Sequence, residues 1–331
     1  MNQIKHPTLL KTATLIYNPI AGRKPKRREG QIQDAVTALA ASGIKVKLAQ
    51  TAGPGTGGQM AREEARRGET LILVCGGDGT INEVINGLVP GEATLGILPG
   101  GTANIIAKEL GLPHDPVRAA LELPDWRPRR IALGRVTWPA ARAGPTQDRS
   151  VDQRYFLSVS GVGFDAYVVY KLSSAFKMSL GVAAYVAEAV RQALRHSFPV
   201  FVCKVDGPQF RGREFRATFA TIQRTGLYAG WLRLAPGARF FEAQFRVCLF
   251  KSRSRARYFV YAAAVLARQH LRLSDVELVE AQRVSCAAAD PEQRIHFELD
   301  GELAGELPAT FEVVPEALTL LAPEEKLETR N

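Results

Sequence analysis

Glycine-rich segments that also carry polar side chains recur along the first third of the chain. They are YNPIAGRK (17–24), CGGDGT (75–80) and LPGGTAN (98–104). Because glycine lacks Cβ, another group can approach its backbone closely. A glycine-rich turn that opens a helix presents unpaired N–H groups at the positive end of the helix dipole, and phosphate is the usual ligand there. The segments therefore predict phosphate binding, although a tight turn between a strand and a helix would use the same residues.

Asp78 stands inside the second of these segments. Its carboxylate would repel a phosphate, unless Mg²⁺ bridges the two groups or the carboxylate contacts another part of a nucleotide. Mg²⁺ in proteins takes one or two carboxylates together with phosphates and water. Thr80, near the expected helix start, could serve only as an N-cap. The chain has no GxxxxGKS/T loop and no GxGxxG loop after the first expected strand, so neither a P-loop nor a Rossmann site is indicated.

Alternating strands and helices must position these segments. The apolar pattern predicts strands at 12–17, 44–48, 71–75 and 93–98, and helices at 32–39, 60–67, 81–88 and 102–110. This alternation is typical of an α/β domain with a parallel sheet, where ligands bind beyond the carboxyl ends of the strands. The glycine-rich segments follow the first, third and fourth strands, so we expect them at one edge of the sheet.

The pattern changes after Pro124 and predicts a β-rich, mostly antiparallel second domain. Strands are expected at 130–137, 155–160, 200–205, 215–222, 246–250, 276–279 and 295–299, with helices at 173–196 and 255–269. Residues 138–150 are expected to form a solvent-exposed loop within a hairpin.

Composition narrows the function. The chain has 331 residues, 46% of them hydrophobic, which suits two domains. We expect a cytoplasmic protein, because no signal-peptide pattern and no apolar run near the roughly 20 residues of a membrane span occur. The four cysteines and five histidines lack the spacing of disulfide or zinc sites. The net charge of +10 suits nucleotide phosphates or an anionic membrane surface, and nucleic acid is not expected without a recognisable motif. A homodimer is left open.

The ordered set of motifs resembles the catalytic domain of the diacylglycerol kinase and sphingosine kinase family, and most closely the bacterial soluble lipid kinases. GGDGT by itself is also similar to NAD kinases and phosphofructokinases. The segments that carry the resemblance are YNPIAGRK, CGGDGTINEVINGL (75–88), LGILPGGTANIIAKELG (95–111), GVGFDAYVV (161–169), GLYAGWLRLAPGA (226–238) and LDGE (299–302).

The resemblance implies a fold and a site. The fold is an α/β ATP-binding domain at 1–125, completed by about 310–331, plus a β-rich, antiparallel sandwich-like lipid-substrate domain at 126–309. Asp78, Asp300 and Glu302 would hold Mg²⁺ and carry catalysis, with Asp300 as the base for the acceptor hydroxyl. Alternatively, Asp300 only forms an Asp-Gly turn between strands at 295–299 and 310–314. The residues expected to line the ATP site are Asn18, Thr51, Gly76, Gly77, Asp78, Gly79, Thr80, Ile81, Asn82, Glu83, Gly101, Thr102 and Asn104.

Several positions depart from the family pattern. Ile105 follows Asn104 where the family often has an acid, so one polar contact to nucleotide or metal is expected to be missing. Gly58-Gln59-Met60 replaces a Gly-His-Ala sequence. Phe240-Phe241-Glu242-Ala243 replaces a paired acid and glycine, which leaves open whether a structural Mg²⁺ site exists.

The sequence thus favours an ATP-dependent lipid kinase whose acceptor is diacylglycerol, a sphingoid base or a related lipid. The alternatives are a kinase of a soluble acceptor, similar to NAD kinase, and a non-catalytic nucleotide- or lipid-binding protein. Two basic stretches, 22–28 and 251–270, could contact ATP, acidic headgroups or an anionic membrane, or could simply be a solvated helix start and a core-packing helix. Some side chains of a helix at 175–193 could line an acyl-chain pocket.

Overall fold

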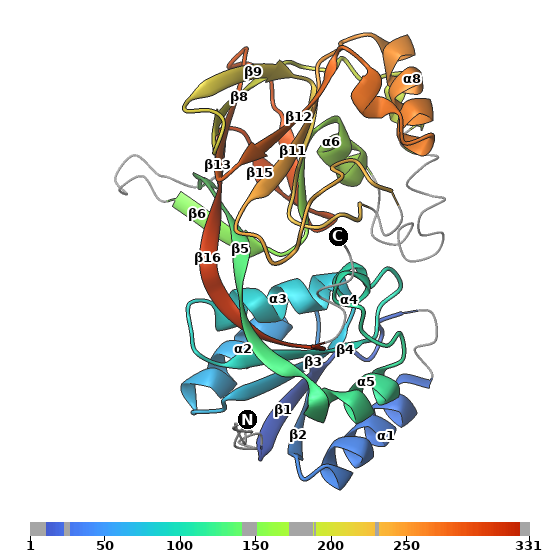
Figure 1. Ribbon diagram of the computed structural model, residues 1–331, viewed down its shortest axis with the longest axis vertical. Coiled ribbons are helices and arrows are strands. Elements are labelled where there is room, and N and C mark those ends of the chain that lie inside the picture. The colour runs from blue at the N-terminus through green and yellow to red at the C-terminus, as the bar shows by residue number, and fades with distance from the viewer. Residues whose placement is uncertain are drawn as a thin grey trace, which may run out of the picture. The chain divides into compact units, whose positions relative to one another are not determined.

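The computed structural model of the chain describes residues 11–22, 27–140, 151–171, 188, 190–228 and 232–324. It divides into two units, whose elements are labelled in Figure 1. The first unit comprises Met1–Ile131 and Glu316–Asn331, and the second comprises Ala132–Pro315. The predicted fold class, an α/β domain together with a β-rich antiparallel domain, is confirmed. No helix among the described residues is long and apolar enough to span a membrane.

The first unit is a parallel sheet with helices on both faces (Figure 1). Its strand order is β2-β1-β3-β4-β16, and α2 packs against α3 while α1 packs against α5. β3 is buried along its whole length, as expected for a strand that is covered on both faces. The elements are β1 (Thr12–Tyr17), α1 (Arg28–Ala41), β2 (Lys45–Gln50), α2 (Thr56–Arg66), β3 (Leu71–Gly76), α3 (Asp78–Leu88), β4 (Thr94–Pro99), α4 (Ile105–Leu110), α5 (Pro116–Glu122) and the end of β16 (Ala309–Ala322).

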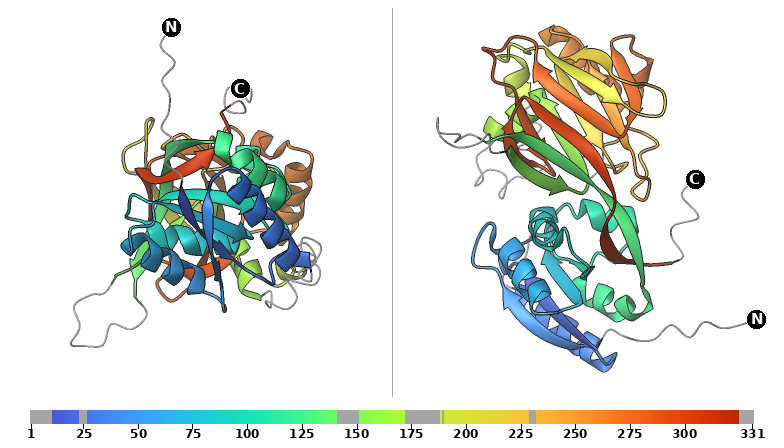
Figure 2. Two further views of the ribbon diagram at one scale, coloured as in Figure 1. Left: turned by 90° about the horizontal axis from the view of Figure 1, so that it is seen from below. Right: turned by 90° about the vertical axis from the view of Figure 1, so that its left-hand side faces the viewer.

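The second unit has two antiparallel sheets (Figure 2). Buried side chains from both sheets form one hydrophobic core cluster. One sheet has β16-β13-β8-β9 together with β5 and β6, and the other has the order β12-β11-β10-β7-β14-β15. The elements are β5 (Arg127–Pro139), β6 (Val151–Phe156), β7 (Val159–Gly163), α6 (Phe164–Lys171), β8 (Phe201–Asp206), β9 (Arg213–Ala217), β10 (Phe219–Gln223), β11 (Phe245–Phe250), α8 (Arg255–Leu266), β12 (Val276–Ala281), β13 (Arg283–Ala288), β14 (His296–Leu299) and β15 (Glu302–Glu306).

Two predicted strands were wrong in the same way, because each is two strands. The strand expected at 155–160 is β6 followed by β7, and that expected at 215–222 is β9 followed by β10. In both cases the chain passes from one sheet to the other at the break. The N–H of Ser158 donates to the Asp300 carboxylate, and the N–H of Thr218 donates to the Phe250 carbonyl. These hydrogen bonds to distant residues interrupt the pairing of each strand within its sheet. The alternation of apolar and polar residues in the sequence does not reveal them.

Smaller differences concern element ends and missed elements. The helix predicted at 102–110 begins only at Ile105, because Asn104 has a positive φ of 48°. The strands β13 and β15 and the helices α5 and α6 were not predicted. The hairpin around 138–150 is confirmed by the antiparallel pairing of β5 with β6, although residues 141–150 lie outside the described part. Most of the helix predicted at 173–196 lies outside it as well.

Candidate active site

The glycine-rich segments leave three neighbouring strands, as predicted. β3 pairs with β1 on one side and with β4 on the other, all in parallel, so the three strands end at the same edge of the sheet. The ladder continues past the strand ends: the N–H of Asn18 donates to the Cys75 carbonyl, and the N–H of Gly100 donates to the Gly76 carbonyl, both at 3.0 Å. These backbone bonds hold the starts of the segments side by side.

Two of the segments touch through their glycines. A Cβ placed on Gly101 would lie only 2.4 Å from the Cα of Gly77, and a Cβ on Gly100 would lie 3.1 Å from the backbone nitrogen of Gly76. Any larger residue at Gly101 would therefore push the two loops apart. The glycines are required by this close approach as well as by any ligand.

The α3 helix starts directly in the CGGDGT segment. Gly77 is its N-cap, with extended backbone, and as a glycine it brings no side chain of its own to cap the helix. Thr80 is therefore not the N-cap, and its hydroxyl instead accepts a hydrogen bond from the Asn18 side chain at 3.2 Å. A helix N-terminus with a glycine as its N-cap, beside two glycine-rich loops, is a site that suits an anion.

Asp78 connects the second segment to the third. Its Oδ1 accepts a hydrogen bond from the Ile105 N–H, the first residue of α4, at 2.8 Å. The Asn104 side chain closes the third segment, because its Oδ1 accepts from the Gly101 N–H at 2.8 Å and its Nδ2 donates to the Gly101 carbonyl at 3.1 Å. The carboxylate of Asp78 is thus held at the start of two helices, α3 and α4.

The other expected ATP-site residues of this unit differ in their surroundings. Thr51 is buried just after β2, and its N–H donates to the Tyr17 carbonyl at 2.9 Å. Ile81 is buried, and the Oδ1 of buried Asn82 accepts a hydrogen bond from the Asn86 side chain at 3.1 Å. Gly79 is partly buried and Thr102 is exposed.

Glu83 binds the start of another helix. Its carboxylate accepts hydrogen bonds from the N–H groups of Gly55 at 2.7 Å and Gly57 at 3.2 Å, at the N-terminus of α2. A carboxylate in this place satisfies unpaired helix N–H groups and interacts favourably with the helix dipole. The structure therefore gives Glu83 a role in joining α3 to α2.

We expect Glu83→Gln to lower the free energy of unfolding by about 1–2 kcal/mol, because one N–H of α2 loses a charged acceptor. Urea denaturation would measure the change, with Glu92→Gln as control, since the Glu92 side chain is 96% exposed. Affinity for Mg·ATP should stay nearly the same. A variant of normal stability that no longer binds Mg·ATP would show that Glu83 belongs to the nucleotide site instead.

Arg28 was predicted as part of a basic surface, and this was wrong. Its side chain is 5% exposed and donates to the carbonyls of Ala21 at 2.9 Å and Gly100 at 2.5 Å. It also approaches the thiol of Cys75 at 3.8 Å, and burial raises the pKa of that thiol to about 11. Arg28 therefore ties the first and third glycine-rich segments together. Of the other basic residues of that stretch, Arg27 is exposed, as a basic surface requires, and those at 23, 24 and 26 lie outside the described residues.

Asp300 lies in the second unit, in the two-residue turn between β14 and β15. Asp300 and Gly301 both have positive φ, 50° and 87°, as a type I′ hairpin turn requires. The turn was predicted as an alternative role, but its second strand is β15 rather than residues 310–314. Asp300 is more than a turn residue, because its carboxylate also accepts three backbone hydrogen bonds, from Leu157, Ser158 and Val159 at 2.9–3.0 Å.

Glu302, two residues after Asp300, starts β15. Its carboxylate accepts a hydrogen bond from the Arg154 guanidinium of β6 at 2.8 Å, and its side chain is 50% exposed. The hairpin thus presents two carboxylates with different surroundings, one fixed by backbone N–H groups and one paired with an arginine at the surface.

Sequence reasoning missed a buried acidic pair next to this hairpin, formed by Asp165 and Glu298. The Glu298 carboxylate accepts from the N–H groups of Gly161 at 2.5 Å and Gly301 at 2.6 Å. Asp165 lies next to it, because a Cβ on Gly161 would be 2.0 Å from an Asp165 oxygen and 2.9 Å from a Glu298 oxygen. Tyr228 donates to Asp165. Burial, and then the neighbouring Asp165, raise the pKa of Glu298 well above its ordinary value. Asp165 lies in the GVGFDAYVV segment, but nothing in the sequence pairs it with Glu298.

A buried arginine was also missed. Arg224 is fully buried and donates to the carbonyls of Ala132, Phe240 at 2.7 Å and Glu242 at 3.2 Å. Burial lowers its pKa to about 10. The Phe240–Glu242 backbone, where the chain departs from the family pattern, therefore binds this guanidinium.

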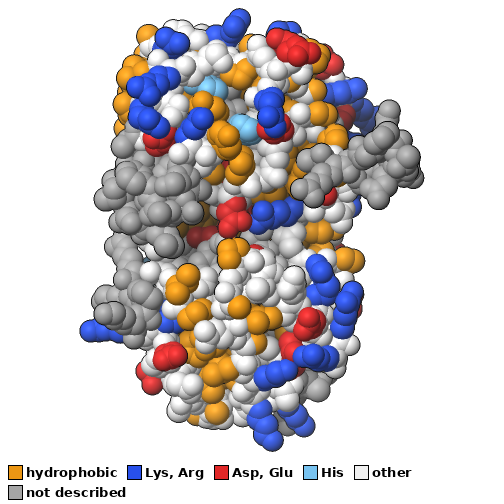
Figure 3. Space-filling model, turned by 180° about the vertical axis from the view of Figure 1, so that it is seen from behind, with side chains coloured by type: hydrophobic (Ala, Val, Ile, Leu, Met, Phe, Trp, Pro, Cys, Tyr) orange, Lys and Arg blue, Asp and Glu red, His pale blue; other side chains and the backbone are white. Residues whose placement is uncertain are grey.

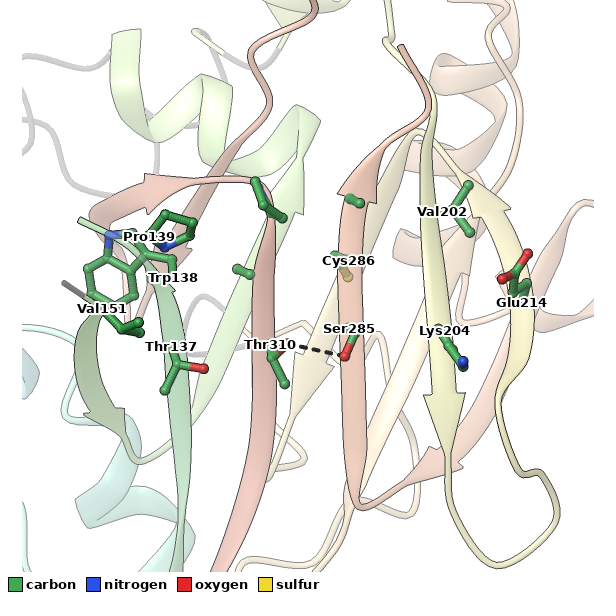
Figure 4. Close-up of a pocket in the computed structure, with 13 residues that line it drawn as sticks. Thr137, Trp138, Pro139, Val151, Val202, Lys204, Glu214, Ser285, Cys286 and Thr310 are labelled. Atoms are coloured by element: carbon green, nitrogen blue, oxygen red, sulfur yellow. Dashed lines mark hydrogen bonds between the residues drawn. The ribbon is translucent and has the colours of Figure 1, made fainter. Parts of the chain in front are cut away.

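The described residues of the second unit also line a shallow pocket of about 470 Å³ on the face of one sheet (Figure 4). Trp138 and Val151 lie at one side of it, and Lys204 and Glu214 at the other, with a hydrogen bond between Ser285 and Thr310 at 3.1 Å. None of the predicted site residues lines this pocket.

The three carboxylates expected to act together are divided between the units: Asp78 belongs to the first, and Asp300 and Glu302 belong to the second. Within the part of the chain that the structure describes, no three acidic, histidine or cysteine side chains gather as a ready metal site. A common site for the three carboxylates therefore stays a prediction.

Comparison with known proteins gives a consistent result. Residues 12–136 match the diacylglycerol kinase catalytic domain, and residues 158–322 match the YegS C-terminal NAD kinase beta sandwich-like domain. A diacylglycerol kinase of Bacillus subtilis (strain 168) is 29% identical over 323 residues, covering 96% of this chain and 99% of that protein. A diacylglycerol kinase of Staphylococcus aureus is 24% identical over 315 residues, covering 95% of this chain and 93% of that protein.

Solved structures share the fold. A diacylglycerol kinase structure from Bacillus anthracis (strain Sterne) has a TM-score of 0.68 at 21% identity, covering 96% of this chain and 98% of that one. The two domain matches and the relatives that span nearly the whole chain agree with this shared fold. The chain belongs to the diacylglycerol kinase catalytic-domain family and is a kinase that acts on a hydroxyl acceptor.

Proposed function

We propose that this enzyme transfers the γ-phosphate of ATP to the hydroxyl group of a lipid, with diacylglycerol as the first candidate. The observation that carries the proposal is the N-terminus of α3, which has a glycine as its N-cap and lies between two glycine-rich loops, with Asp78 in its first turn. The two relatives described above are both named diacylglycerol kinase, which supports the choice of acceptor.

The residues of the first unit suit the binding of a nucleotide triphosphate. The N-terminal end of α3 would face the phosphates, and the glycines of the second and third segments would let them approach the backbone. Asn18, bonded to Thr80, and Arg28, bonded to Ala21 and Gly100, would keep the loops in place. Phosphoryl transfer depends mostly on such positioning and on charge stabilisation.

The donor set fits Mg²⁺ that is bound together with phosphates. Asp78 supplies one carboxylate beside an anion site, and Mg²⁺ commonly takes one or two protein carboxylates with phosphates and water. When bound, the ion would neutralise charge on the transferred phosphoryl group. Asp300 would accept the proton of the lipid hydroxyl, and Glu302 beside it would contribute a second carboxylate.

The main alternative is a kinase of a soluble acceptor. The second domain matches a model described as NAD kinase beta sandwich-like. Among soluble acceptors, this match favours NAD. A non-catalytic binding protein fits less well, because Asp78, Asp300 and Glu302 are all present.

An acceptor screen tests the proposal. Purified protein with Mg²⁺ and ATP labelled at the γ-phosphate is expected to label diacylglycerol or another hydroxyl lipid in detergent micelles. NAD and free polyols, tested in parallel, should take up no label. Labelled NADP with no labelled lipid would reject the lipid kinase in favour of the soluble-acceptor alternative.

A further inference from the structure

The helix α8 has one face buried and the opposite face exposed. Tyr258, Tyr261 and Val265, spaced at helical intervals, pack into a core cluster with side chains of β7, β11 and β12. The exposed side carries large apolar residues, with Phe259 40% exposed, Val260 43% and Leu266 61%. Clustered apolar side chains on a surface usually mark an interaction site, whereas single ones do not.

Basic residues flank these apolar ones along the chain. Residues 251–272 contain six lysines and arginines and no acidic residue. Two of the six are paired, Lys251 with Glu277 and Arg257 with Asp275. The other four are exposed and form no ion pair with any described residue: Arg253, Arg255, Arg268 and Arg272.

We define the α8 surface as the exposed residues of this stretch that are basic or large and apolar. They are Arg253, Arg255, Phe259, Val260, Leu266, Arg268, Leu271 and Arg272. Figure 3 shows one face of the molecule, on which acidic and basic side chains lie interspersed. The α8 surface combines exposed apolar groups with arginines that form no ion pair with a described residue.

We propose that the α8 surface docks the enzyme on an anionic lipid bilayer. The occupant follows from charge complementarity: the cluster has only positive charge, and anionic headgroups attract such clusters. The apolar side chains on the same helix face suit the boundary between headgroups and acyl chains, where amphipathic helices lie. No described helix is able to span a membrane, so docking of this kind would bring the enzyme to a lipid acceptor. In this last point the inference rests on the proposed function.

Vesicle sedimentation tests the surface without any kinase assay. The protein should bind phosphatidylglycerol–phosphatidylcholine vesicles more tightly than pure phosphatidylcholine vesicles, and added salt should weaken the binding. The double variant Arg253→Glu with Arg255→Glu should lower the partition coefficient onto the anionic vesicles by about tenfold or more. Each basic residue near an anionic surface contributes substantially to the free energy of binding. Leu266→Ser should lower it on both kinds of vesicle.

Matched controls lie elsewhere on the chain. Arg211→Glu with Arg216→Glu makes the same change of charge at exposed positions around β9. Leu121→Ser removes a leucine of α5 that is 58% exposed, close to the 61% of Leu266. Both controls should bind vesicles like the unaltered protein. Equal losses in the controls and the α8 variants would overturn the proposal, as would equal binding to neutral and anionic vesicles.

A kinase assay separates this inference from the proposed function. With short-chain diacylglycerol dissolved as monomers, the α8 variants should turn over normally, and with diacylglycerol in anionic vesicles they should be slowed by about as much as binding is weakened. Normal vesicle activity in the α8 variants would overturn the docking role. If vesicle binding depends on α8 but no lipid is phosphorylated in either form, the docking surface stands and the lipid-kinase proposal fails.

Discussion

Replacing Asp300 by asparagine is expected to lower turnover by about 10²-fold or more, the usual scale for the loss of a positioned base. Asparagine cannot take up the proton of the acceptor hydroxyl. Affinity for Mg·ATP should change little, because Asp300 belongs to the second unit and the glycine-rich loops proposed to bind the phosphates belong to the first. Initial rates and isothermal titration with Mg·ATP on the same preparation would measure both quantities.

The structure adds a necessary control. The Asp300 carboxylate accepts three backbone hydrogen bonds, so the amide of asparagine would place a donor against at least one N–H group. We therefore expect a loss of about 1–3 kcal/mol in the free energy of unfolding. Rates must be taken well below the thermal transition. Glu302→Gln serves as comparison, because its exposed ion pair with Arg154 contributes little to stability. A folded Asp300→Asn enzyme with near-normal turnover would leave Asp300 a purely structural residue and move the search for the base to Glu302.

Asp78→Asn should affect binding as well as turnover. Asparagine keeps an oxygen that can accept the hydrogen bond from the Ile105 N–H, so the connection between the second and third glycine-rich segments is preserved. The negative charge is lost, and the other carboxylate oxygen is replaced by an NH2 donor. If Asp78 contributes to Mg²⁺ binding beside the phosphates, turnover should fall by about 10²-fold or more, the scale seen when one electrostatic group of a catalytic site is removed.

The affinity for Mg·ATP should fall by about tenfold or more in the same variant, the equivalent of one charge-assisted contact. Its unfolding transition should be close to that of the unaltered protein, which separates a binding defect from a folding defect. Unchanged affinity for Mg·ATP together with unchanged turnover would show that Asp78 serves only to join α3 to α4.

The sequence was most informative where chemistry and local structure coincide. The CGGDGT segment follows a strand of apolar residues and opens a helix. The sequence therefore predicted both elements and the edge of the sheet at which the segment lies. The Asp-Gly turn at 300–301 was recognisable from its residue types. The strand β15 that follows the turn was not recognisable, because Leu303 is the only large apolar residue in Glu302–Glu306.

The parts that could not be predicted depend on groups far apart in the chain. Arg28 looked like one more residue of a basic run, and its burial depends on the carbonyl of Gly100. The breaks between β6 and β7 and between β9 and β10 depend on acceptors at Asp300 and Phe250. Likewise, Asp165 and Glu298 become a buried pair only once β7 and β14 are neighbours. A single sequence does not contain these pairings.

The transfer itself is the most direct test of the account. The enzyme is mixed with Mg²⁺, ATP labelled at the γ-phosphate and diacylglycerol in detergent micelles, and ADP and labelled lipid are measured together. We expect labelled phosphatidic acid in an amount equal to the ADP formed, and no product when Mg²⁺ is chelated. ADP that forms without labelled lipid across the hydroxyl lipids tested, or label that appears on NAD instead, would contradict the account.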